Sequence, residues 1–209
     1  MTTILVTGFG PFPGAPFNPT GPLVERLARL RRPGVKIVPY VFKTSYAAVD
    51  RDLPKLIAKH KPDALLMFGL ATRARKLRIE TRAQNALALL PDAAGKTPRR
   101  GAIAAGKPAA IAMPMPAQSL LAAVRKTGVP VRRSRDAGRY LCNYLCWRAA
   151  EAAGKAKGPC LAAFVHVPLV ARGPRQPAKR RQLTLDDLTR AGSALLRVVA
   201  TFRPESAPI

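Results

Sequence analysis

Apolar runs and segments with helical spacing alternate along most of the chain. A short apolar run at 4–6 and a longer one at 64–69 are typical of strands buried on both faces of a parallel sheet. Between residues 19 and 31, apolar side chains recur every three or four positions, which predicts a helix. The same reasoning predicts strands at 35–42, 76–83, 129–131 and 161–167, and helices at 46–60, 116–127 and 140–153.

This alternation predicts an α/β fold in which a mostly parallel central sheet lies between helical layers. At 209 residues the chain is long enough for one domain with a sizeable core, and no repeat or linker divides it, so we expect a single domain over 1–209. Residues 90–110 are rich in Pro, Gly and Ala and predict a long loop or hairpin. A basic, Pro-containing loop is expected at 171–181, and Thr184 with Asp187 resembles a capping box that starts the last helix.

The charge of the chain is extreme. It has 36 Lys and Arg against 11 Asp and Glu, a formal net charge of +25. Such a balance is compatible with binding to nucleic acid. The basic residues are dispersed, however, and aromatic residues make up only 6%, too few to predict a stacking platform for single strands. We therefore expect a basic surface without a specific nucleic-acid partner.

Cysteine usage and the N-terminus suggest a compartment. The three cysteines, Cys142, Cys146 and Cys160, have no spacing typical of a disulfide framework or a zinc finger, which favours a reducing environment. The first apolar run lacks a preceding basic region and predicts a strand rather than a signal peptide. No apolar run approaches the ~20 residues that a membrane span needs. We expect a cytoplasmic protein without a membrane segment.

Cys142 is the strongest candidate for chemistry. It lies where a turn at 134–139 becomes the helix predicted at 140–153, and the positive end of a helix dipole favours thiolate. The chain has only two histidines, so a partner imidazole must come from His166, in the strand at 161–167, or from His60. A cysteine paired with an imidazole is an activated nucleophile, which points to a cysteine hydrolase.

An imidazole in such a pair needs an orienting partner. Glu80 is the leading candidate because it lies in an apolar-alternating stretch after a buried strand, and Asp136 and Asn143 are weaker alternatives. Each residue also has a purely structural interpretation. A lone cysteine or histidine on an apolar element is usually part of the core, and Glu80 has arginine neighbours with which it could pair.

Taken together, these motifs resemble the pyroglutamyl peptidase I family (pyrrolidone-carboxylate peptidases), and the likeness covers essentially the whole chain. The matching segments are residues 4–12 with Asn18 and Pro19, Val41–Phe42 and Ser45, residues 60–63, Glu80 with Ala83 and Asn85, Pro91–Asp92 and Gly95, Ala137–Gly138 with Cys142–Asn143, and residues 166–168.

The resemblance implies a three-layer α/β/α sandwich and a cysteine exopeptidase that removes an N-terminal pyroglutamyl residue through a thioester. It implies that Cys142 is the nucleophile, His166 the general base and acid, and Glu80 its orienter, without a metal or cofactor. The residues expected against the pyroglutamyl ring are Phe9, Phe12, Tyr140 and Leu141. The implied partners are N-terminally blocked peptides, and the family often forms tetramers.

Several features depart from the family pattern, among them the loss of glycines after Leu70 and a segment between Asn85 and Pro91 that is one residue shorter, and two positions are the prime suspects for a change in activity. Leu70 stands where the family commonly has glutamine, and Leu89 where it has an arginine thought to help stabilise the oxyanion. Loss of one oxyanion donor typically costs about 3 kcal/mol. The activity is therefore expected to be reduced, or directed at another small acyl amide or ester. A third hypothesis is a catalytically weak protein that binds acidic ligands through its positive charge.

Overall fold

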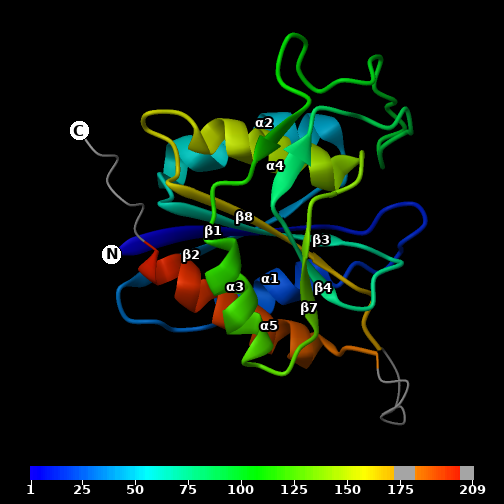
Figure 1. Cartoon of the computed structure of the whole chain (residues 1–209). Helices are drawn as coiled ribbons and strands as arrows, with labels where there is room; N and C mark the ends of the chain where they lie inside the picture. Colours follow the sequence, from blue (N-terminus) through cyan, green and yellow to red (C-terminus); the bar gives the residue numbers. More distant parts are fainter. Residues whose placement is uncertain (172–181, 203–209) are drawn as a thin grey trace.

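Six strands form the central sheet, in the order β2-β1-β3-β8-β4-β7 (Figure 1). The computed structural model describes residues 1–171 and 182–202. The strands of this sheet are β1 Thr2–Phe9, β2 Val35–Phe42, β3 Ala64–Leu70, β4 Leu77–Glu80, β7 Val131–Ser134 and β8 Leu161–Val167.

The sheet is mostly parallel. Strands β2, β1, β3 and β8 pair in parallel, whereas β4 pairs antiparallel with β8 and parallel with β7. Every residue of β3 and β8 is buried, which explains why these strands are continuous apolar runs. The expected α/β class is confirmed.

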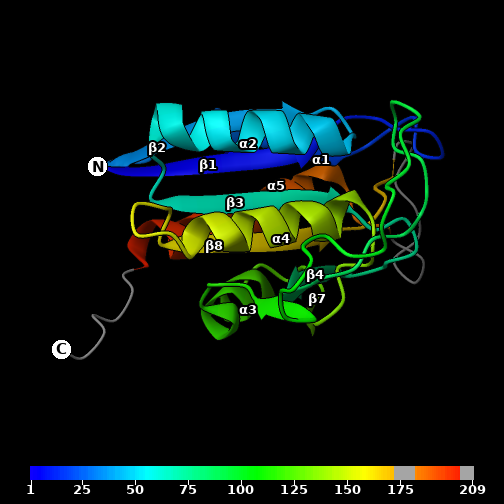
Figure 2. The ribbon, with the colours of Figure 1, turned by 90° about the horizontal axis from the view of Figure 1, so that it is seen from above.

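Helices cover both faces of the sheet (Figure 1). Figure 2 shows α2 and α4 side by side over one face, and α1, α3 and α5 lie over the other. Their bounds are α1 Thr20–Ala28, α2 Tyr46–His60, α3 Ala117–Arg125, α4 Leu141–Ala153 and α5 Leu185–Thr201. Two apolar clusters fill the interfaces, one around Leu23, Leu66 and Leu195 and the other around Phe42, Met67 and Trp147. The three-layer arrangement expected from the sequence is therefore present.

Some predicted bounds shift for local reasons. The strand expected at 129–131 begins at Val131, after Pro130, which has no N–H to donate to a ladder. The single strand expected at 76–83 divides into β4 and the short β5 Arg82–Gln84. The helix expected over 19–31 ends at Ala28. Most of the basic loop predicted at 171–181 lies outside the described residues.

The segment between β5 and β6 (Ala110–Ala112) is a long loop held by one half-buried amide. Of the two alternatives predicted for residues 90–110, the long loop is present, and the strands that flank it, β5 and β6, pair antiparallel. The side chain of Asn85 accepts hydrogen bonds from the N–H groups of Ile103 and Ala104 and donates to the carbonyl of Ala104. The same side chain also donates to the carbonyl of Lys107, so one amide bonds to four backbone groups and fixes the loop without regular secondary structure.

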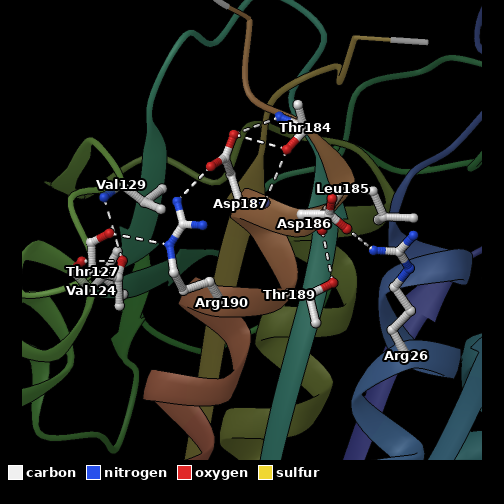
Figure 3. Close-up of polar contacts among 10 residues, drawn as sticks. All are labelled: Arg26, Val124, Thr127, Val129, Thr184, Leu185, Asp186, Asp187, Thr189 and Arg190. Carbon is white, nitrogen blue, oxygen red and sulfur yellow. Dashed lines mark hydrogen bonds and ion pairs between the residues drawn. The ribbon is translucent and has the colours of Figure 1, made fainter.

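Helix α5 begins at the predicted capping box (Figure 3). The Thr184 hydroxyl accepts a hydrogen bond from the N–H of Asp187 at 3.2 Å, and the Asp187 carboxylate accepts one from the N–H of Thr184 at 2.9 Å. Arg190 pairs with Asp187, and Arg26 of α1 pairs with Asp186. These contacts fix the first turn of α5 and join it to α1. None of the described helices has the length and apolar character needed to cross a membrane.

We predict that Thr184→Ala destabilises the fold by about 1 kcal/mol, because the N–H of Asp187 loses its side-chain acceptor. Urea unfolding of the variant and the parent measures the change. Thr201→Ala, at the exposed C-terminal end of the same helix, is the matched control. Equal stability of the Thr184 variant and this control would contradict a role for the capping box.

Candidate active site

Three elements bring the candidate catalytic residues to one end of the sheet. Strands β3 and β8 run in parallel, and Gly69 near the end of β3 pairs in register with His166 near the end of β8. Helix α4 begins at this edge and carries Cys142 as its second residue. Glu80 is the last residue of β4, the strand on the other side of β8. Residues separated by up to 86 positions in the sequence therefore converge.

Glu80 and His166 form a buried contact. The Nδ1 atom of His166 lies 2.8 Å from the Oε1 atom of Glu80, and the two residues are 3% and 0% exposed, respectively. The Nε atom of Arg78 lies 3.4 Å from the same oxygen. In this arrangement the carboxylate accepts from Nδ1–H, which leaves Nε2 as the ring nitrogen available to the sulfur. His166 is thus held in one tautomer and orientation.

The antiparallel pairing of β4 with β8 places Glu80 within reach of His166. Arg78 is the residue directly opposite His166, and Glu80 lies opposite Phe164, so Glu80 is diagonal to the imidazole on the same face. The ring of Phe164 meets the His166 ring edge-on, with centroids 5.1 Å apart. The imidazole is therefore confined by an aromatic side chain as well as by a carboxylate.

Cys142 occupies space that a glycine leaves open. A Cβ atom built on Gly69 would lie 2.7 Å from the Cys142 sulfur and 2.5 Å from the ring of Phe164, both closer than real contacts allow. Tyr140, the N-cap residue of α4, forms no side-chain hydrogen bond that caps the helix. The N–H groups of the first turn therefore keep their partial positive charge near the sulfur.

Electrostatics at the site favour a charged imidazole. Burial by itself lowers the pKa of His166, but the charge of the Cys142 sulfur, a hydrogen bond with it and the Glu80 carboxylate outweigh burial and raise this pKa to about 9. An imidazolium beside a sulfur stabilises thiolate. Cys146, one turn later, is fully buried, and burial raises the pKa of its thiol. Of these two cysteines, Cys142 is the one that is partly exposed and interacts with His166.

The weaker sequence candidates have other partners. The side chain of Asn143 accepts from the N–H of Gln84 and donates to the carbonyls of Gln84 and Ala86. Asp136 accepts from the side chain of Gln84 and from the N–H of Gly138. Neither residue contacts His166 in the described part of the chain. His60 ends α2. Glu80 and His166 are thus the pair that the fold assembles.

A cavity of about 660 Å³ opens beside Cys142 and His166. Leu70, Ala71 and Tyr140 contribute apolar surface to it, and the Tyr140 hydroxyl donates to the carbonyl of Pro91 at 2.9 Å. The remaining lining residues are Thr72, Arg73, Ala74, Arg75, Lys76, Arg78, Arg132, Ala137 and Gly138. The Cys142 thiol and the His166 imidazole therefore share one accessible space.

The residues expected against the substrate ring are placed unequally. Tyr140 lines the cavity, whereas Phe9 is packed on Phe42 with ring centroids 5.8 Å apart, and Leu141 is buried in the core. Phe12 is half-buried in a tight turn with Ala15. None of these last three residues lines the cavity, so their contact with a ligand stays a prediction.

Two residues of the site, and the structural role of a third, escaped the sequence analysis. Strand pairing places Gly69 and Arg78 on either side of His166, which local sequence does not show. Asn143 holds residues 84–86 because of its position on α4. A glycine that ends an apolar strand is the one local signal that could have been used. Among the described residues, no group of three or more His, Cys, Asp or Glu could hold a metal ion.

Comparisons with known proteins agree along most of the chain. The model of the pyroglutamyl peptidase family matches residues 2–189. Pyrrolidone-carboxylate peptidase 1 of Ralstonia nicotianae is 31% identical over 202 residues, 94% of each chain. Pyrrolidone-carboxylate peptidase of Thermococcus kodakarensis is 31% identical over 166 residues, which are 79% of this chain and 80% of the relative.

The structural likeness is equally extensive. The crystal structure of Bacillus amyloliquefaciens pyroglutamyl peptidase I superimposes with a TM-score of 0.85 at 27% sequence identity, covering 97% of this chain and 98% of the other. The resemblance inferred from the sequence motifs is confirmed. The chain belongs to the pyroglutamyl peptidase family of cysteine peptidases.

Proposed function

We propose that this protein hydrolyses the amide bond that follows an N-terminal pyroglutamyl residue, with Cys142 as nucleophile, His166 as acid and base, and Glu80 as the residue that orients His166. The observation that carries the proposal is the buried contact of Glu80 with His166 beside the Cys142 sulfur at one cavity. A purely structural core has no need for a charged imidazole there.

The first half of the reaction is acylation. The Cys142 thiolate attacks the pyroglutamyl carbonyl carbon, and the carbonyl oxygen becomes an oxyanion. The N–H of Cys142 lies in the first turn of α4, where backbone donors lack helical partners, and it stabilises this charge. When the C–N bond breaks, imidazolium gives its proton to the departing amine, which leaves a thioester and a neutral His166.

The second half of the reaction is deacylation. Neutral His166 removes a proton from water as the water oxygen attacks the thioester carbon. The C–S bond then breaks, pyroglutamate leaves, and the thiolate–imidazolium pair is restored. Glu80 holds the ring through both halves, because its contact to Nδ1 at 2.8 Å stabilises the charged ring and fixes the position of Nε2.

The acyl pocket is mostly apolar near the nucleophile. Tyr140 and Leu70 line the cavity beside Cys142, and apolar walls with few polar groups suit a small neutral lactam. We infer that Phe9, Phe12 and Leu141 support this wall, Phe9 and Leu141 from the core behind it.

A second substrate class has one observation in its favour. Leu70 is 8% exposed and lines the cavity, and Leu89, at the position of the family arginine, is 61% exposed. An apolar side chain at Leu70 favours a less polar acyl group. A small acyl amide or ester other than a pyroglutamyl peptide is therefore the alternative substrate.

We infer a cytoplasmic location, because a thiolate nucleophile works only while reduced, and neither Cys142 nor Cys146 is in a disulfide. A homo-oligomer, such as the tetramer expected from the resemblance, is part of the same proposal.

The proposal predicts release of a fluorogenic amine from a pyroglutamyl amide under reducing conditions. We expect Cys142→Ala to lower kcat/KM by roughly 10⁴-fold or more, because the covalent route is removed. Cys146→Ala is the matched control and should retain activity, since this thiol is buried in the core. A folded parent protein that hydrolyses another acyl amide but not this substrate would support the alternative class.

The raised pKa of His166 predicts a pH limit. As pH rises through about 9, the imidazolium loses the proton that the leaving amine needs, so kcat/KM should fall. Glu80→Gln keeps the size of the side chain but removes a charge that stabilises imidazolium, so this limb should move to lower pH. The pH profile of kcat/KM for both proteins measures the shift. An unchanged limb in the variant would rule out Glu80 as the partner of His166.

The close approach at Gly69 predicts a steric effect. Gly69→Ala should lower kcat/KM by about 10²-fold, because its methyl group displaces the Cys142 sulfur or the Phe164 ring that borders His166. Gly21→Ala is the control, since a Cβ there meets its nearest neighbour at an ordinary 3.8 Å. Thermal unfolding distinguishes displacement of the sulfur from general loss of structure. Full activity of Gly69→Ala would show that the sulfur does not need this space.

A further inference from the structure

One wall of the active-site cavity is strongly cationic. Its lining includes five basic side chains: Arg73, Arg75, Lys76, Arg78 and Arg132. No aspartate or glutamate is among the described residues that line the cavity. Each cation in such a wall raises the local potential, and a concave surface focuses it.

The basic residues come from two places that the fold brings together. Strand pairing sets His166, Arg78 and Arg132 opposite one another on β8, β4 and β7, so the three form a row across the sheet. The loop between β3 and β4 supplies Arg73, Arg75 and Lys76. The cationic wall therefore begins at His166 and extends away from it.

Most of this charge is uncompensated. Arg78 has a partner, because its Nε atom lies 3.4 Å from the Oε1 atom of Glu80. Arg73, Arg75, Lys76 and Arg132 are exposed, and none of the four forms a salt bridge within residues 1–171 and 182–202. Like charges gathered without partners repel one another, and a bound anion relieves that repulsion.

The position of the wall identifies the part of the substrate that meets it. The proton donor for the departing amine is His166, so the leaving peptide must lie against His166 rather than on the far side of Cys142. The pyroglutamyl ring is a neutral lactam and gives the cations nothing to pair with. The charge complement must therefore lie in the leaving peptide.

We propose that the cationic wall binds a carboxylate of the leaving peptide, and that the protein prefers pyroglutamyl peptides with an acidic residue directly after the scissile bond. This inference rests on the proposed function, which it extends to the leaving-group side. Arg132 and the cations of the loop between β3 and β4 select this residue, whereas Arg78 also positions Glu80 and His166.

The test compares two amidated peptides, pyroglutamyl-Glu-Ala-amide and pyroglutamyl-Gln-Ala-amide, which differ in one charge and hardly in shape. Exposed ion pairs contribute about 0.2–1 kcal/mol each, so several together should give a kcat/KM ratio of about 5–10 in favour of the Glu peptide at low salt. The ratio should fall toward one as ionic strength rises, because exposed charges are screened.

Charge variants connect the preference to the wall. Arg132→Gln should reduce the ratio about two- to fivefold, and Arg73→Gln should act in the same direction. Lys36→Gln is the matched control, because Lys36 is exposed on β2, at the opposite edge of the sheet. The Glu-to-Gln ratio of kcat/KM in this variant should equal that of the parent protein. An equal reduction in the Lys36 variant would overturn the inference, because the preference would then come from the overall charge of the protein.

The carboxylate could belong to the side chain of the leaving residue or to the C-terminus of the peptide. A comparison of pyroglutamyl-Gln with a free C-terminus and with an amidated C-terminus distinguishes these two sources. A preference for the free acid here, with no preference for Glu over Gln in the amidated pair, would overturn the assignment to the side chain.

Binding to Cys142→Ala, measured by calorimetry with the same amidated peptides, separates the two proposals. Tighter binding of the Glu peptide without turnover by the parent protein would support the cationic wall while refuting the proposed hydrolysis. Turnover of both peptides at equal kcat/KM with equal affinities would refute the wall and leave the hydrolysis standing.

Discussion

The buried contact between Glu80 and His166 is the interaction on which the site depends. Both side chains are buried, so water does not screen their charges. The Nδ1 atom of His166 lies 2.8 Å from the Oε1 atom of Glu80. An unpaired carboxylate at this depth would be costly, and so would an unpaired imidazolium. Together with the Cys142 sulfur they compensate one another, which raises the pKa of His166 to about 9. The same compensation stabilises the site and prepares it for chemistry.

The reversed direction of β4 makes this contact possible. The parallel strands β1, β3 and β8 deliver His166 to the carboxyl end of the sheet, and β4 runs the other way beside them. Glu80 and Arg78 thereby lie on the face that carries His166, and Arg132 of β7 continues the row. The reversed direction of β4 and β7 relative to β8 thus brings the Glu80 carboxylate and the cationic wall to the same cavity.

The position of Cys142 depends on two small structural features. Gly69 leaves room for its sulfur, and the start of α4 supplies unpaired backbone donors around it. Asn143 then fixes the neighbouring chain, because its side chain bonds to Gln84 at the end of β5 and to Ala86 on the loop that follows. Cys142 is therefore placed by a helix, a strand end and a loop together, and not by its own segment alone.

Much of the architecture could be inferred from local pattern. The continuous apolar runs of β3 and β8 follow from burial on both faces, and Thr184 with Asp187 marked the start of α5 because a cap is a contact between near neighbours. The division between β4 and β5 escaped prediction, because nothing in residues 76–83 shows where the chain leaves one sheet for another.

The sequence by itself determined the elements, the charge and the candidate types, since hydrophobic period and residue chemistry are local properties. It named Cys142, His166 and Glu80, but it left Asp136 and Asn143 open as orienters. Only the tertiary structure decided among them, because the register of β4 on β8 sets which carboxylate reaches the imidazole. It also decided that Arg132 joins the basic residues at 73–78 beside one cavity, since the pairing of β7 with β4, and not spacing along the chain, brings it there.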